Sequence, residues 1–475
     1  MRLATLDRGR RSCVVVVCLA LLLGACSSAS SNSKKQAGHG STTLGIPTLP
    51  PPTAPHPPGT VSLAAQAYVW GSPLVITERT LQTFARLFGV NRVFSQGALS
   101  TPASRTVVAP NVDTLYSIAV VDLRDGPVVL HVPQIASHYW TYQFVDAWTD
   151  SFAYIGTRAT GGRGGTWLVA PSSFHGATPA GMLRITAPTP QLLMLGRWLP
   201  ASAADVPRLA SAIRTVTMRP LSASQATPVI GAPAGTPQTA AAAGARFFDQ
   251  LGDALAINAP ATKRDTRLLA RFSSLGVDAG RHPGSSGTAT QQQALASGVA
   301  AGEREVQSAA RLNNGATKGW LIHLDIGTYT NALVRAVTAQ FGWGANIPAE
   351  AVYARSTTDA NNRAYNGNNL YGMHFAAGQS PPVKAFWSLT VYGPDQFLVA
   401  NALHRYAIST RTPGFKTNAD GSFDIWIGHT PPASGTANWL PAPAGPFLLS
   451  MRMYLPGASV LNGDYTPPGV TSAAS

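Results

Sequence analysis

Residues 115–132, which read LYSIAVVDLRDGPVVLHV, contain two short apolar, β-branched runs separated by the turn sequence Asp125-Gly126-Pro127. Val and Ile are typical of strands, and Gly and Pro are typical of the turns that separate strands. Further runs follow at Tyr139–Val145 and Thr166–Val169. The stretch from Arg105 to Trp198 therefore predicts an antiparallel β domain.

Helical patterns lie on both sides of this β-rich stretch. Before it, Thr77-Glu78 opens a segment in which Leu81, Phe84 and Phe88 recur at the spacing of one helix face. After it, Ser202-x-x-Asp205 resembles a capping box, and Ala-rich helical patterns continue to about Phe341.

Strands return in the last third of the chain, after Pro348. The runs are Phe386–Tyr392, Phe423–Ile427 and Phe447–Tyr454. We therefore expect a mainly β fold with α: two antiparallel β-rich, sandwich-like domains joined by a helical middle region.

The composition excludes some classes of protein. Of 475 residues, 12% are charged and 45% are hydrophobic, with 45 Gly and 37 Pro, which favours folded domains rich in turns over disorder. The net charge is +14, but no dense basic block with interleaved aromatic residues follows the extreme N-terminus. We therefore expect no nucleic-acid partner.

The N-terminus has the pattern of an export signal. Arg2, Arg8, Arg10 and Arg11 precede the apolar run Val14–Leu23, which is too short to span a bilayer core of about 30 Å as a helix. The run ends in Leu23-Gly24-Ala25-Cys26, which resembles the lipobox of bacterial lipoproteins. We expect Cys26 to carry the lipid and to hold the protein on the outer face of the cell membrane.

The remaining cysteines, Cys13 and Cys18, lie within the signal. With Cys26 acylated, the mature chain would have no free thiol, which excludes disulfides, cysteine-ligated zinc and a cysteine nucleophile. The expected organisation is a lipoprotein signal peptide at 1–25, a disordered Pro/Ser/Thr-rich tether at 26–60, an N-terminal β-rich domain at 61–200, a helical middle region at 201–345, a C-terminal β-rich domain at 346–470 and a tail at 471–475.

Common catalytic motifs are absent from the sequence. It has no Gly-x-Ser-x-Gly elbow, His-Glu-x-x-His helix, Walker loop or Gly-x-Gly-x-x-Gly turn. A divalent metal ion is a cofactor that such a chain could use. Because the ten histidines are scattered along the sequence, we assign no metal ligands.

The densest polar segment is Pro110–Ser117. Asp113 is a candidate catalytic carboxylate, with Asn111, Thr114 and Tyr116 as candidate ligand-binding residues. The alternative is that these side chains close a turn by bonding to the main chain.

A second aromatic-rich strand offers Asp146 as a further candidate catalytic carboxylate and Trp140 as a ligand-binding residue. Carboxylates among aromatic rings can have a raised pKa and act as acids or bases, or can simply bond to backbone amides. The C-terminal block adds candidate binding residues, with ordinary packing as the alternative for each of them: Trp387, Arg405, Tyr406 and Trp439.

These motifs resemble the bacterial exported proteins that pair domain of unknown function 1254 with domain of unknown function 1214. The first half matches through Ala67–Leu74, Pro110–Ser117 and Tyr139–Asp146. The second half matches through Gly344–Asn346, Ala351–Tyr353, Pro381–Thr390, Arg405-Tyr406, Asp420–Ser422 and Asn438–Pro443. The resemblance implies two β-rich domains joined through helical segments, but no settled chemistry.

Two functions remain open from the sequence. The first is an extracytoplasmic hydrolase of an ester, phosphoester or glycan, metal-assisted or not, that uses Asp113 and Asp146. The second is a non-catalytic envelope protein that binds a glycan, lipid or small molecule in an aromatic cleft. The burial cost of carboxylates among aromatic residues favours the hydrolase, and the oligomeric state stays open.

Overall fold

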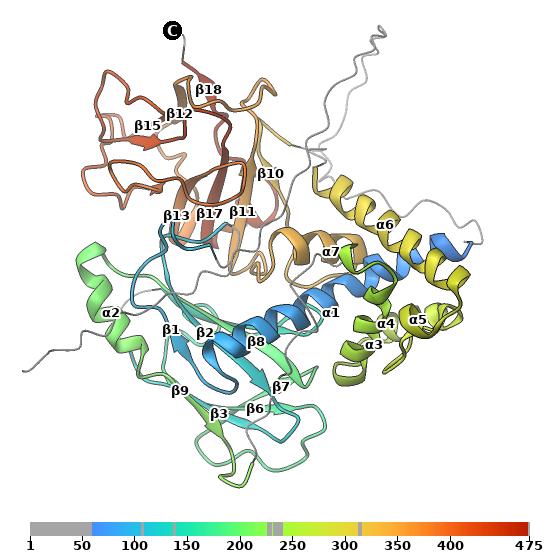
Figure 1. Cartoon of the computed structure of the whole chain (residues 1–475). Helices are drawn as coiled ribbons and strands as arrows, with labels where there is room; N and C mark the ends of the chain where they lie inside the picture. Colours follow the sequence, from blue (N-terminus) through green and yellow to red (C-terminus); the bar gives the residue numbers. More distant parts are fainter. Residues whose placement is uncertain are drawn as a thin grey trace, which may run out of the picture.

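The computed structural model describes residues 59–105, 109–135, 139–225, 230, 241–311 and 316–473. Two β-rich bodies are stacked one above the other, and a group of helices packs beside them (Figure 1). The expected signal, Cys26 and the expected tether up to residue 58 lie outside the described residues. Within the described part, no helix is both long and apolar enough to cross a membrane.

The N-terminal β body is a sandwich of two sheets. Their strand orders are β1-β2-β8-β4-β5 and β7-β6-β3-β9. The strands of the first sheet are β1 (Phe94–Ser95), β2 (Leu115–Asp122), β8 (Gln191–Trp198), β4 (Trp140–Asp146) and β5 (Ser151–Gly156). Those of the second are β7 (Leu183–Ala187), β6 (Gly165–Pro171), β3 (Val128–Val132) and β9 (Thr217–Pro220). Alternating side chains of both sheets, such as Leu115, Val121, Leu130 and Val169, share one core.

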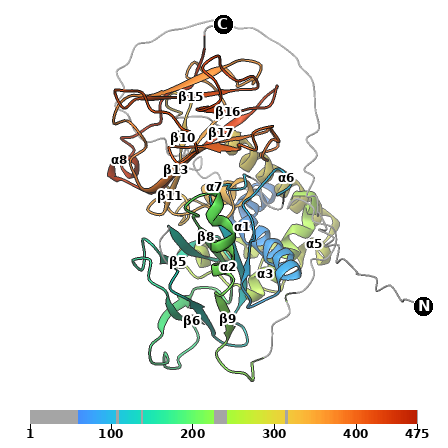
Figure 2. The same ribbon diagram turned by 90° about the vertical axis from the view of Figure 1, so that its left-hand side faces the viewer.

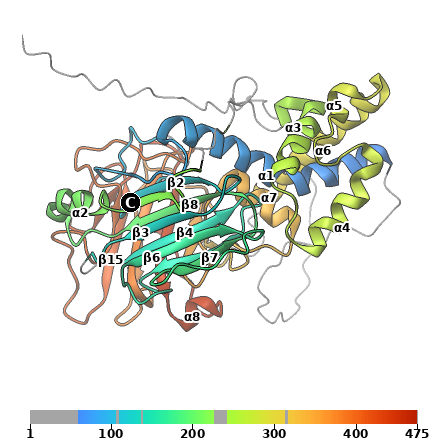
Figure 3. The same cartoon turned by 90° about the horizontal axis from the view of Figure 1, so that it is seen from below.

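The helices form a separate core. Their elements are α1 (Thr60–Phe88), α3 (Phe247–Ile257), α4 (Lys263–Phe272), α5 (Pro283–Ser286), α6 (Ala289–Arg311) and α7 (Ala332–Phe341), whereas α2 (Val206–Ile213) packs on the N-terminal sandwich. Helix α1 runs past α6 at one end and across the first sheet at the other (Figure 3), where Leu81 and Phe84 contact Val120 and Leu193.

The C-terminal β body is a second sandwich, with sheet orders β10-β11-β17-β13-β14 and β16-β15-β12-β18. The strands of the first sheet are β10 (Leu321–Ile322), β11 (Ala351–Ser356), β17 (Leu448–Pro456), β13 (Val383–Tyr392) and β14 (Ala407–Ile408). The second contains β16 (Trp439–Pro441), β15 (Phe423–Gly428), β12 (Tyr371–Phe375) and β18 (Thr471–Ser472), and α8 (Ala458–Leu461) follows β17. Met451, Met453, Phe375 and Ile425 fill the space between these sheets.

The fold class confirms the expectation from the sequence: two β-rich, sandwich-like domains with helices in the middle of the chain. Four details differ from the expected elements and boundaries. Helix α1 begins at Thr60 rather than Thr77 and packs on the helical region. Strand β9 continues the N-terminal domain to residue 220, and β18 brings residues 471–472 into the C-terminal sheet. The pairs β6–β7 and β15–β16 are parallel, within otherwise antiparallel sheets.

The two sandwiches meet end to end, with β8 of the lower body facing β11 and β13 of the upper one (Figure 2). Apolar contacts across this junction join Tyr139 and Leu199 to Phe386 and Tyr454. The segment between α7 and β11 runs beside the same junction. Residues from both halves of the chain therefore come together here.

Candidate functional site

The segment Ala109–Asp113, which contains the start of the polar motif, lies against the C-terminal domain. Three of its groups accept hydrogen bonds from that domain: the Ala109 carbonyl from Arg452 Nη2 (2.9 Å), the Pro110 carbonyl from the Tyr392 hydroxyl (2.7 Å), and Asp113 Oδ2 from Ser388 Oγ (2.6 Å). Asn111 Nδ2 donates a fourth bond, to the Tyr454 hydroxyl (2.9 Å). The motif therefore links the two β-rich domains.

The same segment carries backbone strain. Ala109 has a φ of +49°, a left-handed conformation that costs a non-glycine residue about 1–3 kcal/mol. Asn111 Oδ1 accepts a hydrogen bond from the Asp113 amide (2.6 Å). Asn111 thus closes a turn by bonding to the main chain, and the turn presents Asp113 to the junction.

The C-terminal side of the junction is built by strand register. Tyr353 and Ser388 lie on either side of Arg452, on β11 and β13. Tyr454 is two residues further along β17 and therefore lies on the same face. This face of the sheet meets the Ala109–Asp113 segment.

Asp113 is the only carboxylate that hydrogen-bonds to this face within the described residues. It is partly buried, and Ser388 is its one side-chain hydrogen-bond partner in that part of the chain. Burial raises the pKa of Asp113, and the Ser388 hydrogen bond and the charges of Arg452 and Arg411 oppose that shift. A carboxyl group with a raised pKa can exchange a proton more easily near neutral pH.

Arg197 occupies the N-terminal side of the junction, opposite Tyr116 in the β2–β8 pair. Its side chain is almost fully buried, with the whole residue 5% exposed. It donates to Gln143 Oε1 (2.8 Å), Asn346 Oδ1 (3.2 Å) and the Gly344 carbonyl (2.8 Å). Its Nε is buried and has no partner among the described residues. The partly exposed ring of Tyr116 lies 5.5 Å from the guanidinium carbon.

A buried carboxylate closes the edge of the junction. Glu350 accepts a hydrogen bond from the Tyr139 hydroxyl (2.7 Å) and forms an ion pair with Arg158 Nε (2.6 Å). Burial, followed by the charge of Glu350, raises the pKa of Tyr139 well above its usual value. Tyr139 therefore remains a neutral donor and fastens the chain before β11 to the N-terminal domain.

Asp146 does not share this site. In the sheet it lies opposite Leu192, whereas Leu115, which follows the Asp113 turn, lies opposite Trp198. The difference along β8 corresponds to roughly 20 Å. One oxygen of Asp146 accepts the backbone amides of Trp148 and Asp150 (both 2.9 Å), so this carboxylate closes the turn after β4.

The other candidate residues of the N-terminal domain are buried in or near the core. Trp140 stacks on Trp198 with ring centroids 4.8 Å apart, inside the N-terminal sandwich. Thr114 is fully buried, and its hydroxyl has no partner among the described residues. Of these, only Thr114 adjoins the Asp113 turn.

The candidate ligand-binding residues of the C-terminal domain have structural roles within that domain. Trp387 stacks near Phe375 in the domain core, and Trp439 donates to the Gly428 carbonyl (3.0 Å). Arg405 donates to the carbonyls of Thr436, Ala437 and Trp439, and so holds a loop. Tyr406 packs against the small cluster of Tyr392, Leu398 and Leu448.

The sequence motifs did not point to the arginines of the junction. Arg197 and Arg452 lie in the apolar runs 192–198 (LLMLGRW) and 448–455 (LLSMRMYL). A charged residue inside a strand that is buried on both faces is rare. An arginine inside an apolar run is therefore the sequence feature from which both residues could have been identified.

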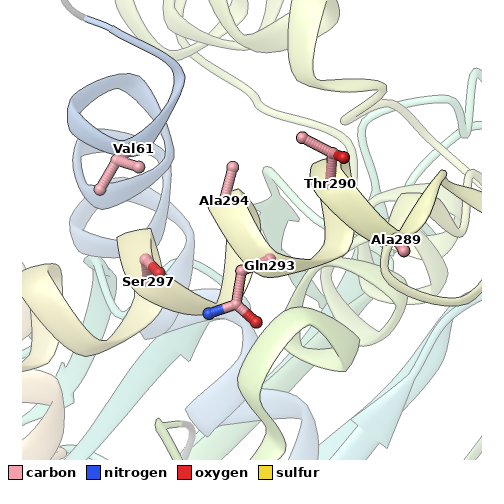
Figure 4. Close-up of a pocket in the computed structure, with 6 residues that line it drawn as sticks. All are labelled: Val61, Ala289, Thr290, Gln293, Ala294 and Ser297. Atoms are coloured by element: carbon pink, nitrogen blue, oxygen red, sulfur yellow. The ribbon is translucent and has the colours of Figure 1, made fainter.

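The junction does not contain a metal-type ligand set. Among the described residues, no three His, Cys, Asp or Glu side chains gather into a group that could hold a metal ion. A hollow of about 540 Å³ lies elsewhere, between the start of α1 and α6 (Figure 4). Small or neutral side chains line it: Val61, Ala289, Thr290, Gln293, Ala294 and Ser297.

Two solved structures are similar to this chain. The crystal structure of the VPA0106 protein from Vibrio parahaemolyticus has a TM-score of 0.67 and 22% sequence identity over 88% of this chain and 100% of its own. A putative uncharacterized protein from Burkholderia cenocepacia gives a TM-score of 0.45 and 14% identity over 86% and 88%. The first likeness supports the fold alone. No curated protein matches the chain.

Two family models match the sequence, both described as proteins of unknown function. DUF1254 covers residues 90–220, which span the N-terminal sandwich, and DUF1214 covers residues 350–458, most of the C-terminal one. Asp113, Tyr116 and Arg197 come from the first match, and Ser388, Arg452 and Tyr454 from the second. The junction is therefore composed of both domains, and the chain belongs to the proteins in which a DUF1254 domain precedes a DUF1214 domain.

Proposed function

We propose that the protein binds a small polar molecule at the junction of its two β-rich domains. The observation that carries this proposal is the convergence of Asp113 and Tyr116, both partly exposed, with Arg197 and Arg452, both buried. Ligand sites commonly lie between domains, where a few polar groups are fixed by a rigid surround. Here the adjoining ends of the two β sandwiches form these rigid surroundings.

The hydrogen bonds around the junction fix these groups before any ligand arrives. Ser388 orients Asp113, and Gln143 and Asn346 orient Arg197. Such preorganisation reduces the entropy that binding would otherwise cost. Tyr116 contributes an aromatic face beside the guanidinium.

A second candidate function is hydrolysis of an ester, phosphoester or glycan. The specific observation that favours it is the raised pKa of Asp113, which suits a group that transfers a proton to or from a substrate. Asp146 would not assist it, because two carboxylates of a glycosidase lie within about 10 Å of each other. Asp113 would therefore act with Tyr116 and the arginines.

One set of proteins tests both functions. Wild type, Asp113→Asn and Asp146→Asn are assayed against ester, phosphoester and glycan substrates, with and without added divalent metal ions, and their thermal melts are recorded. Asn keeps the size of the carboxylate but removes its charge and its role as a proton acceptor. We expect Asp113→Asn to weaken ligand binding or turnover at least tenfold while the variant stays folded, and Asp146→Asn to leave them unchanged.

Saturable binding without turnover in wild type would establish the binding function. Turnover that Asp113→Asn abolishes would establish the hydrolase. Wild-type levels of binding and turnover in Asp113→Asn, with losses only in proportion to unfolded protein, would show that Asp113 serves only the contact between the domains.

We further propose that the protein is held on the outer face of the cell membrane by a lipid on Cys26. The support is the sequence: a basic N-terminus, an apolar run and the residues Leu23–Cys26 in register. The junction site would then act outside the cytoplasm. A membrane-bound protein of this kind would meet small molecules or glycans of the envelope.

A further inference from the structure

The junction holds more positive than negative charge. Arg197, Arg355, Arg411 and Arg452 all lie there, and none of them forms an ion pair with a carboxylate within the described residues. Asp113 acts electrostatically on Arg411 and Arg452. Glu350, the other carboxylate nearby, is already paired with Arg158.

The hydrogen-bond acceptors of these arginines are neutral. Arg197 bonds to two amide side chains and a carbonyl, as described above. Arg452 donates to Thr390 Oγ1 (3.0 Å), the Tyr392 hydroxyl (2.6 Å) and the Ala109 carbonyl. The acceptors of Arg411 are the Pro200 and Ala201 carbonyls, and that of Arg355 is Gln396 Oε1.

Another buried arginine of the chain is paired with carboxylates. Arg335, whose side chain is 2% exposed, bonds to Asp150 (2.8 Å) and lies 3.4 Å from Asp265. This is the usual arrangement, because an uncompensated buried guanidinium is costly. The junction departs from it with two arginines that are each at most 5% exposed.

The junction also contains polar atoms without a hydrogen-bond partner among the described residues. Arg197 Nε and Thr114 Oγ1 are both buried and have no partner among the described residues. Tyr116 is partly exposed and covers the guanidinium of Arg197 with its ring.

We infer that the ligand of the junction site carries an oxyanion, a carboxylate or a phosphate, that neutralises Arg197 and its neighbouring arginines. This inference rests on the proposed binding function and names the chemical class of the ligand. Guanidinium groups bind both oxyanions through paired N–H donors. The partly exposed aromatic rings of Tyr116 and Tyr353 favour an organic anion with a planar body.

The test compares three probes of similar size: benzoate, phenyl phosphate and the uncharged benzamide. Thermal unfolding of the full chain is followed at increasing probe concentration, with sodium chloride holding ionic strength constant. A ligand that binds only the folded state raises the melting temperature by mass action. We expect benzoate or phenyl phosphate to raise it saturably by about 2 °C or more, and benzamide to leave it unchanged.

Three variants locate the effect. Arg197→Gln and Arg411→Gln should each remove at least half of the anion-induced shift, whereas Arg184→Gln, at an exposed arginine on β7, should keep all of it. If Arg197→Gln does not fold, the result for Arg411→Gln decides, because Arg411 is exposed.

Two results would overturn the inference. Equal, Arg411-dependent stabilisation by benzamide and benzoate would keep the binding site but reject the anion. No shift with either anion, or a shift that persists in both junction variants, would reject an oxyanion site here. The binding function itself stands or falls separately, by the Asp113→Asn comparison.

Discussion

Asp113 and Asp146 show how surroundings give the same side chain different roles. Asp146 is 4% exposed and bonds to two backbone amides of its own turn. Asp113 faces the opposite domain through a single side-chain hydrogen bond within the described residues. We therefore assign Asp146 to the stability of the fold and Asp113 to the site.

This assignment predicts a pH effect on stability for Asp146. Burial, followed by the charge of Asp150, raises its pKa to about 7. The folded state therefore holds the proton of Asp146 more tightly than the unfolded state, where the pKa is about 3.9. The stability that this protonated carboxyl contributes is lost as pH rises from about 4 to 7. Asp146→Asn keeps an oxygen for both amides and does not ionise. Its free energy of unfolding should therefore rise relative to that of wild type as pH increases across this range.

Urea unfolding of both proteins between pH 4 and pH 8 measures this difference. Asp278→Asn is the matched control, because Asp278 is exposed and also accepts a backbone N–H. Parallel curves for wild type and Asp146→Asn would contradict the assignment.

At the scale of elements, the strands were predictable and the long helix was not. Val128–Val132 is a strand with the predicted bounds, because β-branched residues end there at Gly and Pro turns. Helix α1 begins 17 residues before the expected Thr77. This part of the helix was not predicted because its buried residues, which include Ala67, Tyr68, Trp70 and Leu74, do not form a single apolar face. The parallel pairs depend on contacts between distant segments, which local patterns do not encode.

The same reasoning explains what was predictable of the site. The polar motif around Asp113 stands out in the sequence, and the structure places it at the domain junction. Arg197 and Arg452 come together only through the register of two separate sheets, more than 250 residues apart in the chain. Trp140, Trp387 and Trp439 looked like binding residues because aromatic rings serve packing and recognition equally well.

The contact between α1 and α6 gives a prediction at this scale. A Cβ added at Gly298 would lie 2.3 Å from Ala64 Cβ and 3.0 Å from backbone atoms of α1. Alanine normally favours a helix over glycine by about 1 kcal/mol, but here the overlap should cost about 1–3 kcal/mol. Gly298→Ala should therefore lower the free energy of unfolding.

Denaturant titration of Gly298→Ala against Gly445→Ala checks the packing. Gly445 has open space around its added Cβ, so its substitution should change stability by less than about 0.5 kcal/mol. A Gly298→Ala protein more stable than wild type would show that the helices lie further apart.

At the scale of the whole molecule, the proposed site is composite, because residues of both β-rich domains meet at the junction. The junction is held by Glu350, Tyr139 and Arg158 at its edge and by the Ala109–Asp113 segment across it. Neither β-rich domain alone contains the site. We propose its position on the cell from the N-terminal sequence instead.

The lipid anchor is tested by Cys26→Ala. Two acyl chains on Cys26 would hold the wild type stably on a membrane, because each buried CH₂ contributes about 0.8 kcal/mol. We expect wild type in the membrane fraction with a lipid mass on its N-terminal peptide, and the variant without either. Identical partitioning, with no lipid on the wild type by mass spectrometry, would refute the anchor.

A crystallographic fragment screen of the full chain tests the central claim most directly. Small polar fragments, charged and neutral, are soaked separately, so that the result does not depend on a guess at the natural ligand. We expect fragments to gather at the domain junction, within hydrogen-bond distance of Asp113, Tyr116 or Arg197. Fragments bound only elsewhere, such as the hollow between α1 and α6, with the junction empty throughout, would contradict it.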